Sequence, residues 1–209
     1  MGVQLNFCSK ILTVYDKINM RKIIATIEEV KTMKTAISIA KWFLAKNRSE
    51  ADECKDNFLT PMQVQKLLYF AQGYFLGCYG KPLFSDEIKA WRYGPVVPEV
   101  YNAYSAFGGK GIDVICSINP HEFNAEEIRT LEIVYEKYSQ YSGIKLSQIT
   151  HEPGSPWSET KRKETISLDK MRSYYEDYML SEEEENELMA LEKKAAAMPK
   201  ILYSRELYA

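Results

Sequence analysis

The amino-acid sequence predicts a mainly α protein: a compact helical domain around one long central helix, with a small β-hairpin. Apolar residues recur every three or four positions through most of the chain, which is the period of an amphipathic helix. Cap residues followed by Pro, Gln or Glu divide this pattern into separate helices. Strand-like alternation is confined to short segments, so we expect the sheet to be a minor element.

The first predicted helix begins after Thr35, where Ala36, Ile39, Ala40 and Phe43 follow helical spacing. The polar run from residue 47 to residue 57 then predicts a loop. Residues 1–34 have mixed charge and are set apart as an N-terminal extension or a misassigned start. The main domain is expected over residues 35–180, with a C-terminal helical segment over residues 181–209.

The central helix has the strongest start signal in the chain. Thr60 can cap the helix, Pro61 suits its first turn, and Gln63 completes a capping box. Gly77 and Gly80 with Pro82 should end the helix. Its apolar stripe is so wide that we expect the helix to be covered on most sides. The residues that form or widen this stripe are Val64, Leu67, Leu68, Tyr69, Phe70, Ala71, Tyr74, Phe75 and Cys78.

The segment after the central helix contains the predicted hairpin. Ile88–Tyr93 is short and aromatic, and Gly94-Pro95 should end it as a strand. Ile112–Ile118 is rich in β-branched residues and is the expected pairing partner. Between the two strands, Val97–Tyr104 has helical spacing.

The second half of the chain carries a series of further helix starts. We expect helices, or helix-like first turns, after each of these cap positions: Asn124 with Glu127, Ser142-Gly143, Ser155-Pro156, Ser167, and Ser181 with Glu184. Beyond them, Leu188–Tyr208 could be a partner-binding tail, a homodimer contact or a helix docked on its own core.

Composition excludes several classes of protein. The 27 Lys and Arg residues against 29 Asp and Glu give a net charge of -2, without the basic excess of a dedicated nucleic-acid binder. The four cysteines are widely spaced, so neither a zinc site nor a disulfide framework is expected. No apolar run is long enough to span a membrane. The sequence also has no secretion signal, so we expect a cytoplasmic protein.

Three blocks of sequence resemble one known family in the same order. They are Leu59–Gly73, then Pro82–Phe84 with Ala90–Val96 and Val100-Tyr101, and finally Leu146–His151 with Pro156-Trp157. Together they resemble the Panacea domain, also described as the SocA-like or phage-associated GepA-like family. The resemblance covers roughly residues 35–179.

The resemblance implies a helical antitoxin domain that binds and neutralises toxins of several unrelated kinds. We therefore expect a protein-binding regulator rather than an enzyme, with no cofactor or metal. The expected partner is a cognate protein toxin, encoded beside this gene. Residues 1–34 show no helix-turn-helix signature, so DNA binding is not expected from them.

Aromatic residues near the first predicted strand are candidate contacts for a partner. Trp91, Tyr93 and Tyr101 could form a binding ledge, because aromatic side chains offer a large contact area with few rotors. Packing around a rigid turn is the alternative. Arg92 alternates away from its two neighbours on a strand and is the better exposed contact.

Two residues of the central helix, Lys66 and Tyr69, are also candidate contacts. Lys66 lies with Gln65 and Gln72 on the less apolar side of the helix. Long polar side chains at such positions usually cover the surface, and we favour that interpretation.

His151 and Trp157 complete the candidate set. They belong to a loop that could lock two helices together or line the partner-binding face, and we prefer the structural role. A metal site would need three or four convergent ligands, and His121 is the only other histidine. The alternatives are a DNA-binding or phage-related regulator and, with less support, a small hydrolase that uses His151.

Overall fold

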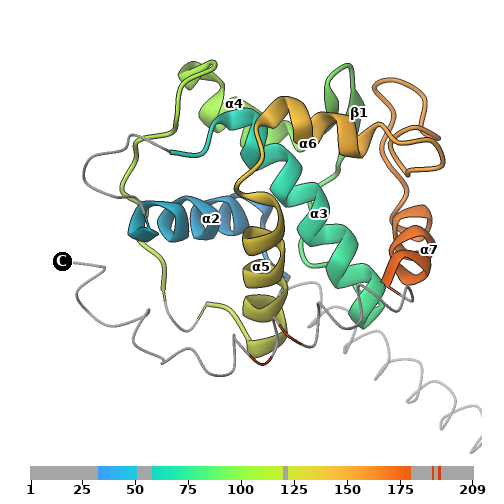
Figure 1. The fold of residues 1–209 in the computed structure, drawn as a ribbon, viewed down its shortest axis with the longest axis horizontal. Coiled ribbons are helices and arrows are strands. Elements are labelled where there is room, and N and C mark those ends of the chain that lie inside the picture. The colour runs from blue at the N-terminus through green and yellow to red at the C-terminus, as the bar shows by residue number, and fades with distance from the viewer. Residues whose placement is uncertain (1–32, 51–57, 120–121, 180–189, 191–192, 194–209) are drawn as a thin grey trace, which may run out of the picture. The chain divides into compact units, whose positions relative to one another are not determined.

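The computed structural model describes residues 33–50, 58–119, 122–179, 190 and 193. Figure 1 shows α3 crossing the middle of the described fold, with α2, α5, α6 and α7 arranged around it. The elements are α2 (Ala36–Glu50), α3 (Pro61–Tyr79), β1 (Lys89–Trp91), β2 (Gly94–Val96), α4 (Pro98–Tyr104), the 3-10 turn η1 (Ser105–Phe107), α5 (Ala125–Tyr138), α6 (Gly143–Thr150) and α7 (Leu168–Met179).

This architecture confirms the predicted mainly α class. The expectations for residues 1–32, and those for residues 181–209 apart from positions 190 and 193, lie outside the described residues. In the part of the chain that the structure describes, no helix is both long enough and apolar enough to cross a membrane.

The central helix α3 begins and ends where its sequence signals predict. The Thr60 hydroxyl accepts the Gln63 backbone N–H at 3.3 Å, and the Gln63 side chain accepts the Thr60 backbone N–H at 2.9 Å. Gly80 ends the helix with φ of 66°, a left-handed conformation that favours glycine. Every residue from Val64 to Leu76 is buried, which confirms that the helix is covered on most sides.

The polar side chains of α3 lie inside the protein rather than on its surface. Gln65, Lys66 and Gln72 are only 4%, 1% and 0% exposed, so the interpretation that they cover the helix surface is wrong. Gln72 accepts the backbone N–H groups of Leu83 and Phe84 at 3.0 and 3.1 Å and donates to the Phe84 carbonyl at 3.1 Å. Buried polar groups are tolerated when they are hydrogen-bonded in this way.

Helix α7 packs closely against α3 at a glycine. The Tyr175 ring occupies the space beside Gly73, where an added Cβ would lie 2.1 Å from the ring carbon Cε2. On the same side of α3, Phe70 stacks on Tyr138 of α5 with ring centroids 4.1 Å apart. Tyr74 and Tyr138 share a hydrogen bond of 3.1 Å between their hydroxyls. The glycine therefore lets an aromatic cluster join α3, α5 and α7.

Helix α5 also packs against α2, through aromatic and charged contacts. Asn124 and Glu127 form the predicted capping box at its start. Phe43 and Tyr135 stack with centroids 6.5 Å apart, and Lys46 forms a buried ion pair with Glu132 at 3.1 Å.

The hairpin exists, but the predicted pairing is wrong. Strand β1 pairs antiparallel with β2, immediately after it in the chain, rather than with Ile112–Ile118. Gly94-Pro95 therefore lies within the second strand instead of simply ending the first. Residues 112–118 form no strand in the described structure, and the Ile112 N–H bonds instead to the Leu59 carbonyl at 2.9 Å. Local pairing across a two-residue turn takes precedence over the more distant β-branched segment.

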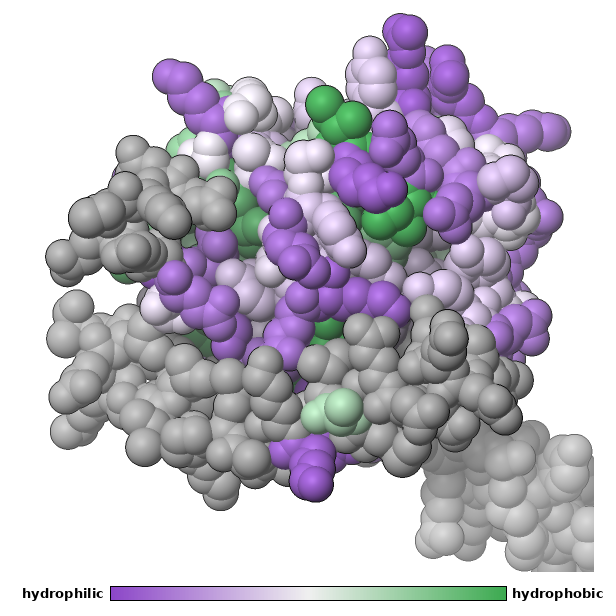
Figure 2. Space-filling view, viewed as in Figure 1, coloured by the Kyte–Doolittle hydropathy of each residue, from purple (hydrophilic) through white to green (hydrophobic). Residues whose placement is uncertain are grey.

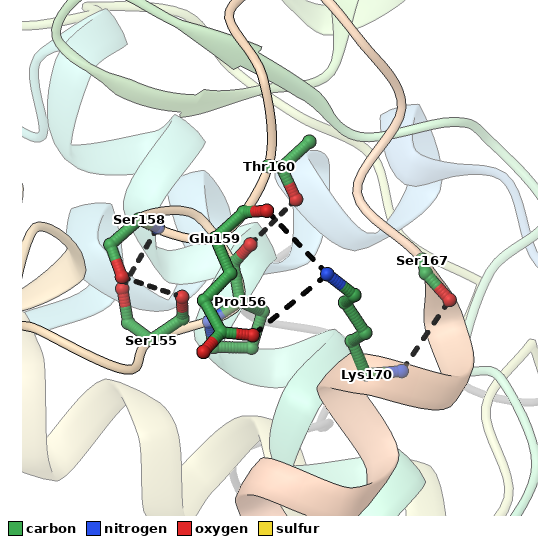
Figure 3. Close-up of polar contacts among 7 residues, drawn as sticks. All are labelled: Ser155, Pro156, Ser158, Glu159, Thr160, Ser167 and Lys170. Atoms are coloured by element: carbon green, nitrogen blue, oxygen red, sulfur yellow. Dashed lines mark hydrogen bonds and ion pairs between the residues drawn. The ribbon is translucent and has the colours of Figure 1, made fainter.

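The start signal at Ser155-Pro156 produces turns instead of a helix. The Ser155 hydroxyl accepts the Ser158 N–H at 3.2 Å, as a helix cap would. The turns continue only to Thr160, whose hydroxyl donates to the Pro156 carbonyl at 2.7 Å. Figure 3 shows how Lys170 of α7 reaches this loop and pairs with Glu159 at 3.8 Å. This ion pair thus joins the loop to α7.

Polar side chains cover most of one face of the described residues (Figure 2). Figure 2 shows a largely hydrophilic face on which hydrophobic residues emerge in small separate patches. Large hydrophobic side chains that are strongly exposed include Tyr93 at 64%, Ile144 at 69% and Ile115 at 85%.

We predict that Gln72→Leu destabilises the fold by roughly 3 kcal/mol. The change leaves two buried N–H groups and one carbonyl without their partner, and each such group costs about 1–3 kcal/mol. Urea unfolding would measure the loss. Gln148→Leu on the exposed side of α6 is the control and should change stability by less than about 0.5 kcal/mol. Equal effects of the two variants would refute the role of Gln72.

We also predict that Gly73→Ala destabilises the packing of α7 on α3. The new methyl overlaps the Tyr175 ring, and overpacking of this kind costs about 1–3 kcal/mol, more than the helix propensity that alanine gains. Gly109→Ala is the control, because a Cβ there meets no atom within 4 Å. A Gly73→Ala protein with the thermal midpoint of the wild type would contradict this packing.

Candidate functional site

Two polar side chains of α3 hydrogen-bond the backbone at the end of the hairpin β1–β2. The Gln65 amide accepts the Val97 N–H at 2.7 Å and donates to the Val97 carbonyl at 3.3 Å. From the next residue of α3, the Lys66 ammonium donates to the Pro95 carbonyl at 3.1 Å. These bonds fix the backbone of β2 and of the start of α4.

Gly94 allows the lysine to approach. It has φ of 103°, a conformation that L side chains rarely adopt, and an added Cβ would lie 2.6 Å from Lys66 Nζ and 2.9 Å from Thr150 Oγ1. Both the backbone conformation and the available space therefore require glycine at this position.

Helix α6 and the loop after it hold the other side of the hairpin. The Ser147 hydroxyl donates to the Tyr93 carbonyl at 2.9 Å, and the Trp157 indole N–H donates to the Trp91 carbonyl at 3.1 Å. His151 stacks on Trp157 with ring centroids 3.6 Å apart and an interplanar angle of 8°. The three blocks that carry the family resemblance therefore meet at one turn.

Aromatic side chains extend from this turn toward solvent. Trp91 meets Tyr101 of α4 edge-on with centroids 5.0 Å apart, and the Arg92 guanidinium lies 5.3 Å from the centroid of the Tyr93 ring. Tyr93 is 64% exposed and Tyr101 is 41% exposed. A cavity of about 450 Å³, called here the aromatic pocket, is lined by Pro61, Met62, Gln65, Lys66, Trp91, Arg92, Tyr93, Val96, Tyr101, Ser105 and Gly108.

A second cavity, called here the basic pocket, shares two residues with the first. It has a volume of about 600 Å³ and is lined by Lys89, Trp91, Arg92, Pro98, Arg162 and Lys163. Lys163 has φ of 71°, and its N–H donates to the Ala90 carbonyl at 2.7 Å, which brings the basic loop beside β1.

Burial controls the electrostatics of the site. Desolvation lowers the pKa of Lys66 to about 7. The pKa of His151 is also lowered, first by burial and second by the positive charge of Lys66. A lysine that changes its protonation near neutral pH is an unusual group and marks this position as a functional candidate.

The structure brings five of the eight candidate residues together in the aromatic pocket: Lys66, Trp91, Arg92, Tyr93 and Tyr101. His151 and Trp157 do not line this pocket: the Trp157 indole bonds the Trp91 carbonyl, and His151 stacks on Trp157. Tyr69 is 1% exposed and lines a different cavity of about 250 Å³, beside Tyr175. The contact role assigned to each residue stays a prediction.

Sequence reasoning missed other residues of the two pockets. Met62, Val96 and Ser105 have no distinctive pattern, and only the fold brings them to the cavity. Arg162 and Lys163 belong to the short basic run 161–163, and that run is the sequence signal that could have pointed to them.

The chemistry visible around His151 favours support over catalysis. Its Nε2 lies 3.5 Å from the Ser147 hydroxyl, at the limit of a hydrogen bond, while that hydroxyl already donates to the Tyr93 carbonyl. A serine nucleophile needs a base that accepts its proton at closer range. Among the described residues, no group of three His, Cys, Asp or Glu side chains could hold a metal ion.

Comparison with known proteins identifies a family. Residues 64–158 match the Antitoxin SocA-like, Panacea domain. Antitoxin SocA of Caulobacter vibrioides (strain NA1000 / CB15N) is 33% identical over 111 residues, which are 47% of this chain and 58% of that protein. The chain thus spans less than two thirds of the relative, and no solved structure matches it. The stretch from residue 64 to residue 158 is therefore a Panacea domain of the SocA-like antitoxin family.

Proposed function

We propose that this protein is an antitoxin that neutralises a cognate protein toxin by binding it through the aromatic pocket and the exposed residues at its rim. The family assignment supports the class of function. The observation that carries the choice of surface is the pair of exposed rings, Tyr93 on the hairpin turn with its fixed backbone and Tyr101 on the adjoining α4.

Rigid support makes these rings effective binding groups. The carbonyls of Trp91, Tyr93 and Pro95 each accept a hydrogen bond from a different element: the loop after α6, α6 itself and α3. A surface that is already ordered loses less conformational entropy when a partner binds. Tyrosine and arginine are also the residue types that most often dominate protein interfaces.

The proposed mechanism is steric. The bound domain covers the active surface of the toxin or holds the toxin in an inactive form, and binding energy replaces any bond chemistry. The toxin is expected from a reading frame beside this gene.

The test is co-expression with the neighbouring small reading frame, with growth rescue and co-purification as readouts. We predict that Tyr93→Ala and Tyr101→Ala each weaken the complex about tenfold or more and reduce rescue, because interface anchors lost in this way cost at least about 1–2 kcal/mol. Unfolding in urea should change little for Tyr93→Ala, whose ring is 64% exposed.

Tyr141→Ala is the matched control for these variants. Its side chain is 38% exposed, close to the 41% of Tyr101, but it lines the cavity beside Tyr69 instead of the aromatic pocket. It should rescue growth as the wild type does. Full rescue and full complex formation by the Tyr93 and Tyr101 variants would reject this surface.

A second candidate, a DNA-binding regulator, is favoured by the basic pocket alone. Its four cationic side chains surround Trp91 and could contact phosphates. DNA affinity would then fall with salt, with a logarithmic slope of about -0.9 for each phosphate contacted, and Arg162→Gln would reduce that slope. Binding that is absent, or that does not respond to salt, removes this candidate.

A further inference from the structure

Lys66 is a buried cation without a counter-charge in the described structure. Its side chain is 1% exposed, and its ammonium makes one hydrogen bond, to the Pro95 carbonyl, although an ammonium has three protons to donate. Within the described residues, no carboxylate lies within ion-pair distance of its Nζ. Such a charge is costly to bury unless it is paired.

The aromatic pocket, which Lys66 lines, has mostly aromatic and apolar walls, and its charged side chains are all cationic. Trp91, Tyr93, Tyr101 and Met62 supply aromatic and apolar surface. Arg92 adds a second cation, and the lining contains neither Asp nor Glu. The adjoining basic pocket is also lined by cations without an acidic residue, although the chain as a whole has a net charge of -2. This local excess of positive charge is complementary to an anion.

We propose that the aromatic pocket binds a carboxylate carried on an apolar or aromatic group, and that this carboxylate forms an ion pair with Lys66. The inference deepens the proposed function, on which it rests for the identity of the partner: the carboxylate belongs to the bound toxin, as an acidic side chain or as the C-terminus.

A carboxylate suits this cavity better than a phosphate does. The pocket offers one buried ammonium and one guanidinium between aromatic walls, which match a single negative charge on an apolar group. A phosphate has no apolar part that could fill the space between the aromatic walls.

Binding should depend on pH because Lys66 must be protonated to form the ion pair. Burial holds the pKa of the free lysine near 7, whereas a bound carboxylate would raise that pKa. The ion pair therefore stabilises the complex fully below pH 7 and weakens as pH rises above it. Between pH 7 and pH 8.5 the affinity should fall roughly tenfold.

Other titratable groups around Lys66 do not mask this effect. His151 faces it from α6 and has a lowered pKa, so this imidazole is neutral throughout the range above pH 7. Arg92 on the hairpin turn is the second cationic group in the pocket lining. The remaining titratable groups in the pocket lining are the phenols of Tyr93 and Tyr101.

The experiment titrates the purified full chain with small probes and follows the protein by NMR and by tryptophan fluorescence. N-acetylphenylalanine presents a terminal carboxylate, and N-acetylphenylalanyl-glutamate amide presents a side-chain carboxylate. N-acetylphenylalanine amide is the neutral control, and inorganic phosphate tests the other anion. We expect at least one carboxylate probe to bind at least tenfold more tightly than the neutral amide, and to lose affinity above pH 7. The better of the two identifies the source of the carboxylate.

Lys66→Met removes the charge and keeps most of the side-chain length. It should abolish the preference for the carboxylate and the pH dependence, whereas Lys145→Met, an exposed lysine on α6, should bind like the wild type. The pH titration of the wild type needs no variant, so it tests the proposal even if Lys66→Met fails to fold. Equal binding of acid and amide, no binding of either acid, or a preference for phosphate would overturn the proposal.

These results are independent of the co-expression test. Carboxylate binding without growth rescue would support the pocket chemistry and reject the antitoxin assignment for that pair. Rescue without carboxylate binding would support the antitoxin and reject the role of Lys66.

Discussion

The structure depends on hydrogen bonds from the buried polar side chains of α3 to the main chain that follows it. Gln65, Lys66 and Gln72 together bond the backbone of four residues between Leu83 and Val97. That stretch is short of regular structure, so its N–H and C=O groups need partners from elsewhere. Because α3 supplies them from the centre of the fold, the hairpin is aligned with the core rather than attached loosely to its surface.

The sequence predicted those features whose causes are local. The capping boxes at Thr60 and Asn124 and the glycine at position 80 each act within a few residues, so they set the limits of α3 and the start of α5 correctly. The hairpin pairing and the burial of Gln65 and Gln72 depend on which distant segment comes to lie against α3. Such contacts have no local pattern, and a glutamine that bonds distant backbone looks in a sequence like one that faces solvent.

The candidate site shows the same division. The aromatic residues at positions 91, 93 and 101 could be selected by residue type, and five of the eight candidates meet at one cavity. Tyr69 could not be separated from them, because its burial beside Tyr175 follows from the packing of α7. The low pKa of Lys66 could not be predicted from the sequence either, because its desolvation depends on neighbours that come together only in the folded chain.

The way the turn is held has a consequence for the evolution of binding specificity. The protein fixes positions 91, 93 and 95 by their main-chain carbonyls, which every amino acid possesses. Side chains at positions 91, 92 and 93 can therefore be exchanged without removing any of those three bonds. In such a domain the main chain maintains the shape of the turn, and the side chains contact the partner. A few side-chain substitutions could therefore change the partner and leave the fold intact.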